Sequence, residues 1–334
     1  MKRTLFSLCL VIVVVIILSA IWINRDMQAY LNAPVNLQED NIFTIQPGDN
    51  LSVIAQALNE AGIIDKPVYF IATARLRGID HQLKAGEYVI ASDMTPIDIL
   101  SIFVQGKVKQ YSLTLIEGWT FREVMSAIND HPALNITLAD KSNEFIMSEL
   151  GSPAFSPEGQ FFPDTYHFPY GTTDIEFLRR AHRQLQSVLL DEWEKRSENL
   201  PYQQAYDALI MASLIEKETG IPEERDRIAG VFVRRLARGM RLQTDPTVIY
   251  AMGKNFDGNI RRKDLDIDSP YNTYRNPGLP PTPIALAGRE ALHAALHPSD
   301  GKDLYFVATG DGGHYFSETL EEHNKAVRKY QLGQ

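Results

Sequence analysis

The feature that most constrains this chain is an uncharged run, Thr4–Ile23, which is rich in Val, Ile and Leu. Its length is about the 20 residues with which an α-helix crosses the hydrocarbon core of a bilayer. Lys2 and Arg3 precede the run, and this charge bias favours a cytoplasmic N-terminus with the rest of the chain on the opposite side. We therefore predict a cytoplasmic stub over residues 1–3 and a single-pass transmembrane helix over residues 4–24.

A cleavable signal peptide is the alternative interpretation of the same run. The apolar core of a signal peptide usually spans about 7–15 residues and ends at a small-x-small cleavage site. Here the core is longer, and no clear Ala-x-Ala follows it. Cys9 lies inside the run rather than after it, which argues against a lipoprotein. The prediction is an uncleaved anchor.

Length and charge limit the remaining possibilities. The chain has 334 residues, which suits one large domain or two modest ones. Its formal net charge of -9 argues against a nucleic-acid partner, because binding to phosphates needs a basic surface. Cys9 is the only cysteine, so no intrachain disulfide can form.

Residues 25–40 are predicted to be a polar tether, and residues 41–108 a small α+β module. Within the module, Phe43–Gln46 alternates like a strand and Pro47–Asn50 is typical of a turn. Apolar residues then recur at helical spacing over Leu51–Leu58. The elements expected further on are a helix at about 66–77, a strand at 86–90, and a helix from Thr95 to about Gly106.

The strand, the Pro-Gly-Asp turn and the start of the helix, Phe43–Leu58, resemble a LysM module. LysM modules are known for binding glycans that contain N-acetylglucosamine. The resemblance implies a LysM-like fold for residues 41–108 and, less directly, glycan binding. A generic strand-turn-helix is the alternative interpretation.

Residues 109–334 are predicted to form a larger mixed α+β domain with a helical core, which makes the fold class α+β. Thr120 and Glu123 have the spacing of a capping box and predict a helix start. Asp245 and Pro246 predict the start of a short helix. The other expected elements are strands at 111–115, 305–308 and 314–316, and helices at about 174–196, 203–219, 222–238, 284–296 and 319–334.

Two glutamates follow a segment without charge, Ala208–Ile215. Such a segment is covered by protein on most sides, and carboxylates are rarely placed beside it unless they are paired or used. Glu216 and Glu218 lie roughly 200° apart around a helix, so they cannot form an acid/base pair on one face. Gly220 places both in the last turn, where the helix dipole and burial raise a carboxyl pKa. A carboxyl that stays protonated near neutral pH suits a general acid; an exposed, solvated helix end is the alternative.

The segment that contains these two glutamates resembles the signature of a known family. Ala212–Thr219 is similar to the signature of the endolytic murein transglycosylase (YceG-like) family. Four more blocks agree in the same order and extend the resemblance over nearly the whole chain. They are Glu158–Tyr166, Gly239–Tyr250, Tyr271–Tyr274 with Gly278–Pro281, and Gly312–Phe316 with His323 and Asn324.

The resemblance implies a lyase that cleaves the β-1,4 bond between MurNAc and GlcNAc within glycan strands and leaves a 1,6-anhydro-MurNAc end. A glycosidase normally needs a second carboxylate, to activate water or to attack the sugar. Here the C6 hydroxyl of the sugar attacks, so one carboxyl can serve as both acid and base. By the resemblance, Glu218 is the catalytic residue and Glu216 has a supporting role. No cofactor is implied.

The other blocks are expected to line the saccharide groove. Free N–H groups at the helix start near Asp245 suit sugar hydroxyls or an acyl group, whereas a plain helix cap is the alternative. A rigid surface loop is the alternative for Tyr271–Tyr274, and a turn around two buried phenylalanines is the alternative for Glu158 and Asp164. The expected groove residues are Gln243, Thr244, Asp245, Thr247, Tyr250, Tyr271, Asn272, Tyr274, Glu158, Asp164 and His314.

His293 and His297 have the i, i+4 spacing of metal ligands. Residue 294 is Ala, however, where the H-E-x-x-H motif has Glu. We therefore predict no metal site.

The family context implies an inner-membrane protein with its catalytic domain in the periplasm. Its substrate is then the nascent peptidoglycan strand, whose length it limits during cell-wall synthesis. Peptidoglycan synthases are the expected protein partners, because an enzyme at the inner membrane reaches nascent strands first. The alternatives are a noncatalytic glycan-binding scaffold and a hydrolytic muramidase that uses the same groove.

Overall fold

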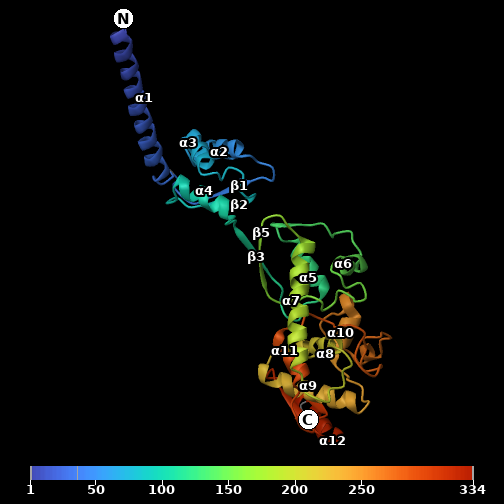
Figure 1. The fold of residues 1–334 in the computed structure, drawn as a ribbon. Helices are drawn as coiled ribbons and strands as arrows, with labels where there is room; N and C mark the ends of the chain where they lie inside the picture. Colours follow the sequence, from blue (N-terminus) through green and yellow to red (C-terminus); the bar gives the residue numbers. More distant parts are fainter. Residues whose placement is uncertain (1, 36, 333–334) are drawn as a thin grey trace. The chain divides into compact units, whose positions relative to one another are not determined.

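The structure is a computed structural model that describes residues 2–35 and 37–332, with side chains from Phe6 onward. It is a mixed α+β protein in which the described strands form two-stranded sheets between helices (Figure 1). The chain forms two compact units. The N-terminal unit comprises Met1–Tyr111 with Phe168–Tyr170, and the C-terminal unit comprises Ser112–His167 with Gly171–Gln334.

The N-terminal unit begins with helix α1, Lys2–Leu31. Its segment Phe6–Leu31 is long and apolar enough to cross a membrane, and the apolar side chains of residues 6–23 are exposed. The helix is therefore compatible with a single-pass membrane anchor. Met1, in the predicted cytoplasmic stub, lies outside the described residues.

The segment expected to be a polar tether is partly helical and partly buried. Helix α1 continues to Leu31, which is 1% exposed, and Val35 belongs to the apolar core of the N-terminal unit. Asp26 forms an ion pair of 2.9 Å with Lys66 and accepts a hydrogen bond from the Tyr69 hydroxyl. The prediction was wrong over this stretch because these contacts come from residues about 40 positions away, which local composition does not reveal.

The rest of the N-terminal unit has the expected order of elements. Asn50 caps the first short helix by accepting hydrogen bonds from the backbone N–H groups of Ser52 and Val53. The two strands pair antiparallel, with Phe43 opposite Tyr88. The elements are β1 (Asn41–Ile45), α2 (Leu51–Glu60), α3 (Pro67–Leu76), β2 (Gly86–Ile90) and α4 (Pro96–Gln105).

The C-terminal unit begins within β3 (Gln110–Thr114), which pairs with β5 (Thr165–Pro169). The predicted capping box is present: Glu123 accepts a hydrogen bond from Thr120 N, and Thr120 Oγ1 accepts one from Glu123 N. The other elements are α5 (Phe121–Asn129), β4 (Leu134–Asn135), α6 (Asn143–Glu149), β6 (Thr172–Thr173), α7 (Asp174–Glu194), α8 (Ala205–Glu218), α9 (Pro222–Ala237), α10 (Asp245–Met252), the 3-10 turns Gly253–Asn255 and Arg262–Asp266, α11 (Arg289–Leu296), β7 (Tyr305–Ala308), β8 (His314–Ser317) and α12 (Leu320–Tyr330).

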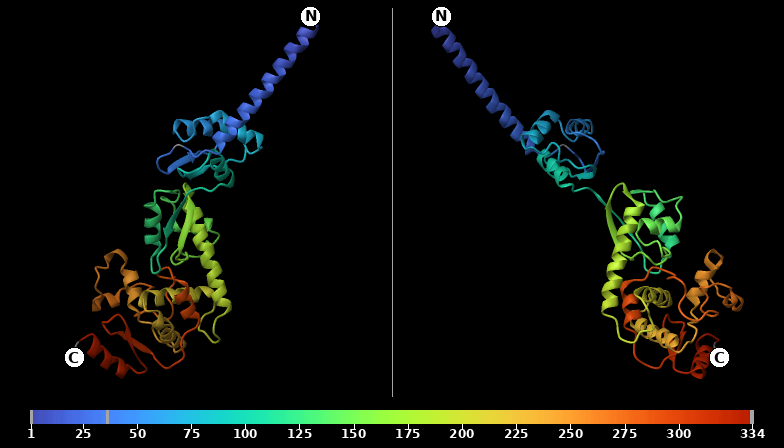
Figure 2. Two further views of the ribbon diagram at one scale, coloured as in Figure 1. Left: turned by 90° about the vertical axis from the view of Figure 1, so that its left-hand side faces the viewer. Right: turned by 45° about the vertical axis from the view of Figure 1, so that its right-hand side comes forward.

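Helix α8 lies at the centre of the C-terminal unit. It packs against α7, α9, α10 and α11, which surround it in both views of Figure 2. Every residue of Ala208–Ile215 is buried, as the uncharged sequence predicts. The last turn of α8, with Glu216 and Glu218, is less buried than the residues before it.

The helix expected over residues 284–296 starts five residues late, at Arg289. The preceding residues are not helical because their N–H groups bond to other segments: Ile284 N donates to Ser213 Oγ at 3.0 Å, and Leu286 N donates to Trp119 O at 2.7 Å. Gly288 is the N-cap of α11. The apolar run here is buried in an irregular segment, which helical spacing alone does not distinguish from a helix.

Candidate active site

The two glutamates at the end of α8 contact different parts of the structure. Glu216 Oε2 accepts a hydrogen bond of 2.9 Å from Gly288 N, at the start of α11. Glu218, the last residue of α8, accepts a hydrogen bond of 2.5 Å on Oε1 from Thr244 Oγ1, at the start of α10. The divergence predicted from helical geometry is confirmed. Glu216 therefore holds the α11 end, whereas Glu218 belongs to a separate polar cluster.

The hydroxyl that contacts Glu218 is itself held firmly. Thr244 N donates to Thr273 Oγ1 at 3.1 Å, and Thr247 Oγ1 donates to Thr244 O at 2.7 Å. The hydroxyls of Thr247 and Thr273 share a further hydrogen bond of 2.9 Å. These three buried threonines fix the position of the donor, so the Glu218 carboxyl meets a preorganised partner.

The electrostatic surroundings keep Glu218 partly protonated at neutral pH. Burial is the main cause: it raises the pKa of Glu218 from its ordinary value of 4.5 to about 7. The hydrogen bond from Thr244 lowers this pKa, the negative charge of Asp245 raises it, and the charges of His314 and Arg235 lower it. A carboxyl with a pKa near the working pH can both donate and accept a proton.

Asp245 is the first residue of α10 and does not cap it. The N-cap is Thr244, which makes no capping hydrogen bond with its side chain. Asp245 instead accepts a hydrogen bond of 2.5 Å on Oδ1 from the Tyr274 hydroxyl. The structure thus places a second carboxylate, from another helix, in the surroundings of Glu218, where it raises the Glu218 pKa. Spacing along α8 gives no sign of this neighbour.

His314 is fixed beside the same cluster by Glu224 on α9. Its Nδ1 lies 2.7 Å from Glu224 Oε2, and its backbone N donates to Glu224 Oε1 at 2.8 Å. Burial raises the Glu224 pKa, but its hydrogen bonds with His314 outweigh burial and hold that pKa below the ordinary value. His314 and Glu224 therefore form an oriented pair whose charge reaches Glu218.

Sequence reasoning missed Arg235, a buried cation on α9. Its Nε donates to Leu304 O and its Nη1 to Leu242 O, each at 2.6 Å. The charge of this guanidinium lowers the Glu218 pKa. Its only signal in the sequence is a basic residue on the otherwise apolar face of α9, beside Val231 and Phe232.

Glu158 is a second buried carboxyl with an unusual environment. Its Oε1 accepts a hydrogen bond of 2.8 Å from Phe121 N, and its Oε2 accepts one of 3.0 Å from the Tyr250 hydroxyl. Burial raises its pKa to about 7 despite these hydrogen bonds. The Tyr250 ring packs 4.8 Å from that of Tyr271, measured between centroids. The predicted groove residues Glu158, Tyr250 and Tyr271 are therefore neighbours.

A cavity of about 480 Å³ opens beside Glu158, and we call it the Glu158 cavity. Lys217 and Pro246 line it, and each lies next in sequence to a member of the Glu218 cluster. The remaining lining residues are Thr120, Arg122, Glu123, Tyr250, Ile249, Gly253, Phe256 and Ile284, with Glu158 itself.

Three other predicted groove residues have local roles. Asn272 is fully buried, and its Nδ2 donates to Leu265 O and Ile267 O, so it shapes the loop that carries Tyr274. Gln243 is exposed and has a positive φ of 52°, a strained backbone immediately before Thr244. Asp164 is exposed and accepts a hydrogen bond from Thr165 N. The structure does not bring Asp164 to the Glu158 cavity.

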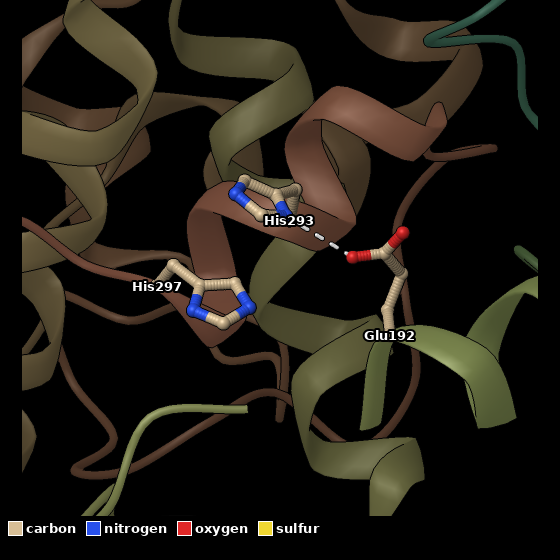
Figure 3. Close-up of side chains that lie close together, drawn as sticks. All are labelled: Glu192, His293 and His297. Atoms are coloured by element: carbon tan, nitrogen blue, oxygen red, sulfur yellow. Dashed lines mark hydrogen bonds and ion pairs between the residues drawn. The ribbon is translucent and has the colours of Figure 1, made fainter. Parts of the chain in front are cut away.

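The two histidines with metal-ligand spacing have a carboxylate neighbour that the sequence did not suggest. Figure 3 shows the Glu192 carboxylate directed at His293, with His297 beside it; ligand atoms of the three residues lie within 4.8 Å of one another. Two imidazoles and a carboxylate are a donor set that Zn²⁺ accepts. Arg289, however, already neutralises Glu192 through a contact of 2.6 Å. An ion-pair network that joins α7 to α11 accounts for this cluster.

Comparison with known proteins relates this arrangement to a family. Residues 43–329 match the YceG-like family, which is most of the chain. The chain belongs to the YceG-like family. A protein of Bacillus subtilis named endolytic murein transglycosylase is 34% identical over 86% of this chain and 83% of its own length. A protein of the same name from Streptococcus pneumoniae is 28% identical over 86% of this chain, which spans 57% of that relative.

A solved structure agrees with the family assignment. The crystal structure of a YceG-like protein from Listeria monocytogenes superposes with a TM-score of 0.58 at 32% sequence identity. The match covers 86% of this chain and 99% of that one. The fold of the YceG-like chain described above is therefore similar to an experimentally determined one.

Proposed function

We propose that this YceG-like protein is an endolytic peptidoglycan transglycosylase and that Glu218 is its single general acid and base. The enzyme class is supported by the relatives named endolytic murein transglycosylase. The observation that carries the residue assignment is the Glu218 carboxyl, which is partly buried, is oriented by Thr244 and has a pKa raised to about 7. Glu216, whose carboxylate is engaged with Gly288, has the structural role.

The proposed reaction needs one proton donor and no external water. Protonated Glu218 donates its proton to the glycosidic oxygen between MurNAc and GlcNAc, and the C1–O bond breaks. The C6 hydroxyl of the same MurNAc residue attacks C1, forms the 1,6-anhydro ring and gives its proton to the Glu218 carboxylate. The carboxyl is thereby restored, and the products are an anhydro-MurNAc end and a GlcNAc end. A pKa of about 7 suits both proton transfers.

Hydrolysis at the same site is the second candidate function. The position of the Asp245 carboxylate near Glu218 favours it. This carboxylate lies in the surroundings of Glu218 and comes from a different helix. A second carboxylate of this kind is what a hydrolase uses to activate water or to attack the sugar. The hydrogen bond that Asp245 accepts from Tyr274 at 2.5 Å orients it and suits a positioning role in the transglycosylase.

Analysis of the products from purified peptidoglycan separates the candidates. Anhydro-MurNAc ends are the expected result, reducing MurNAc ends would indicate a hydrolase, and no new ends would indicate a binding protein. The Glu218→Gln variant is expected to lose activity by about 10²- to 10⁴-fold, while the matched Glu216→Gln variant keeps most of it. A fully active Glu218→Gln enzyme beside an inactive Glu216→Gln enzyme would contradict the residue assignment.

We further propose that the N-terminal module binds glycan as a LysM-like module. The strand and the helix that carry the resemblance are present as β1 and α2. A polar cavity of about 480 Å³ opens at the start of α2 and offers hydroxyl, amide and charged groups to sugar hydroxyls. Its lining includes Asp49, Asn50, Ser52, Arg75, Asp80 and His81.

The proposed location is the inner membrane, with a cytoplasmic N-terminus and the catalytic unit in the periplasm. Helix α1 supports a single-pass anchor by its length and composition. In this position the enzyme meets nascent strands and limits their length, and peptidoglycan synthases are the partners we propose.

A further inference from the structure

The Glu158 cavity is separate from the Glu218 cluster but adjoins it along the chain. None of Glu218, Thr244 and Asp245 lines the cavity. Lys217 on its wall is the residue before Glu218, and Pro246 is the residue after Asp245. The volume of about 480 Å³ is within the range of small-ligand sites. A single substrate that reaches both places must therefore carry a branch or a neighbouring unit beside its scissile bond.

The charges that line the cavity indicate whether it suits a charged branch of the substrate or a neighbouring sugar unit. Arg122 and Lys217 line the cavity, and neither forms an ion pair with a carboxylate in the part of the chain that the structure describes. Lys217 Nζ donates one hydrogen bond, to Gly118 O at 3.2 Å, which leaves two of its donors for a ligand. Arg122 is exposed, and its guanidinium offers five donors in a fixed fork.

The two acidic residues of the cavity already accept hydrogen bonds from the protein. Glu123 Oε2 accepts hydrogen bonds of 2.7 Å from both Thr120 N and Thr120 Oγ1. Glu158 is engaged by Phe121 N and the Tyr250 hydroxyl, and burial keeps it partly neutral near pH 7. Arg122 and Lys217 thus stand against Glu123 and a partly neutral Glu158, which leaves the lining a small excess of positive charge and favours a carboxylate over a neutral saccharide.

We propose that the Glu158 cavity binds the acidic peptide carried by the muramic acid residue next to the scissile bond, with Arg122 and Lys217 as carboxylate donors. This inference rests on the proposed function. The glycan backbone of a peptide-substituted strand is neutral, because the lactyl carboxyl of muramic acid is consumed in the amide bond to the peptide. The branch that supplies free carboxylates is the peptide itself. The enzyme then prefers peptide-bearing strands to strands whose peptides have been removed.

The test compares the full-length enzyme in detergent on two substrates: uncrosslinked strands with intact peptides, and the same strands after an amidase has removed them. Wild type is expected to have a higher kcat/KM on the peptide-bearing strands. Arg122→Gln is expected to reduce this preference by about tenfold, the effect of losing one charge-assisted contact. Arg328→Gln, an exposed arginine on α12 away from the cavity, is the matched control and should keep the wild-type preference.

A binding measurement separates failure of this inference from failure of the proposed function. Calorimetry with Glu218→Gln protein measures the affinity for a tetrasaccharide fragment with and without its peptide. A loss of about tenfold on adding Arg122→Gln, seen only for the peptide-bearing fragment, supports the peptide site even if no cleavage is found. Equal kcat/KM for both substrates in wild type, or equal losses on both in Arg122→Gln, would overturn the peptide site and leave the transglycosylase proposal intact.

Discussion

Replacement of Glu218 by Gln should make the protein more stable at alkaline pH. The pKa of this carboxyl is raised from 4.5 to about 7 by folding, mainly through burial. The folded state therefore binds more protons than the unfolded state between these two values, so stability falls as the pH rises from about 4.5 to 7. Gln cannot ionise, so the variant escapes this loss.

The size of the effect follows from the two pKa values. At about 1.36 kcal/mol per pH unit, the ionised Glu218 destabilises the fold by about 3 kcal/mol above pH 7. The stability of Glu218→Gln relative to wild type should rise from near zero at pH 4 to about 3 kcal/mol at pH 8. Near pH 4 the amide oxygen can still accept the hydrogen bond from Thr244, so little else changes.

Urea unfolding of the full chain in detergent at pH 4, 6 and 8 measures this difference. The C-terminal unit contains Trp119 and Trp193, and the remaining tryptophan, Trp22, lies in the apolar helix α1. Tryptophan fluorescence therefore follows mainly the unit that holds the site. A Glu218→Gln variant no more stable than wild type at pH 8 would refute the argument that burial sets this pKa.

Glu224→Gln is the control of opposite sign. Contacts with His314 hold the Glu224 pKa below its ordinary value even though burial raises it. A depressed carboxyl pKa contributes stability above the unfolded pKa and loses it as the pH falls through the folded pKa. Glu224→Gln should therefore be less stable than wild type at pH 8, and the difference should shrink below about pH 4.5. At pH 8, Glu218→Gln should therefore be more stable than wild type and Glu224→Gln less stable.

Two further predictions test how the site is held. Thr244→Val removes the hydroxyl that lowers the Glu218 pKa. Because a hydrogen bond to a charged group contributes about 1.5 kcal/mol or more, the alkaline limb of the kcat/KM profile should move from about pH 7 to about pH 8. Thr247→Val removes a contact that positions Thr244 but keeps the Thr244 hydroxyl, so it should move the limb by less. Gly159 has a φ of +71°, and a Cβ there would lie 2.4 Å from Pro283 Cβ, so Gly159→Ala should lower the free energy of unfolding by about 2 kcal/mol or more; an unchanged urea midpoint would contradict this.

Much of the fold could be predicted because it depends on local spacing. The capping box at Thr120, the helix from Pro222 and the hairpin at residues 305–317 follow from patterns of a few residues, and the structure confirms them. The errors occurred where a local pattern was ambiguous. The tether was polar in composition but helical as far as Leu31, and residues 284–288 were apolar but not helical.

The candidate site likewise has features that follow from local spacing and features that depend on tertiary contacts. The sequence by itself determined that Glu216 and Glu218 point apart, because residues two positions apart lie about 200° from each other around a helix, and that both lie beside a buried core. Only the tertiary structure decided what each contacts. The bond from Thr244 to Glu218 joins residues 26 positions apart, and that from Tyr250 to Glu158 joins residues 92 apart. Such contacts, and the pKa values that burial produces, depend on how helices pack, which no local pattern along the chain encodes.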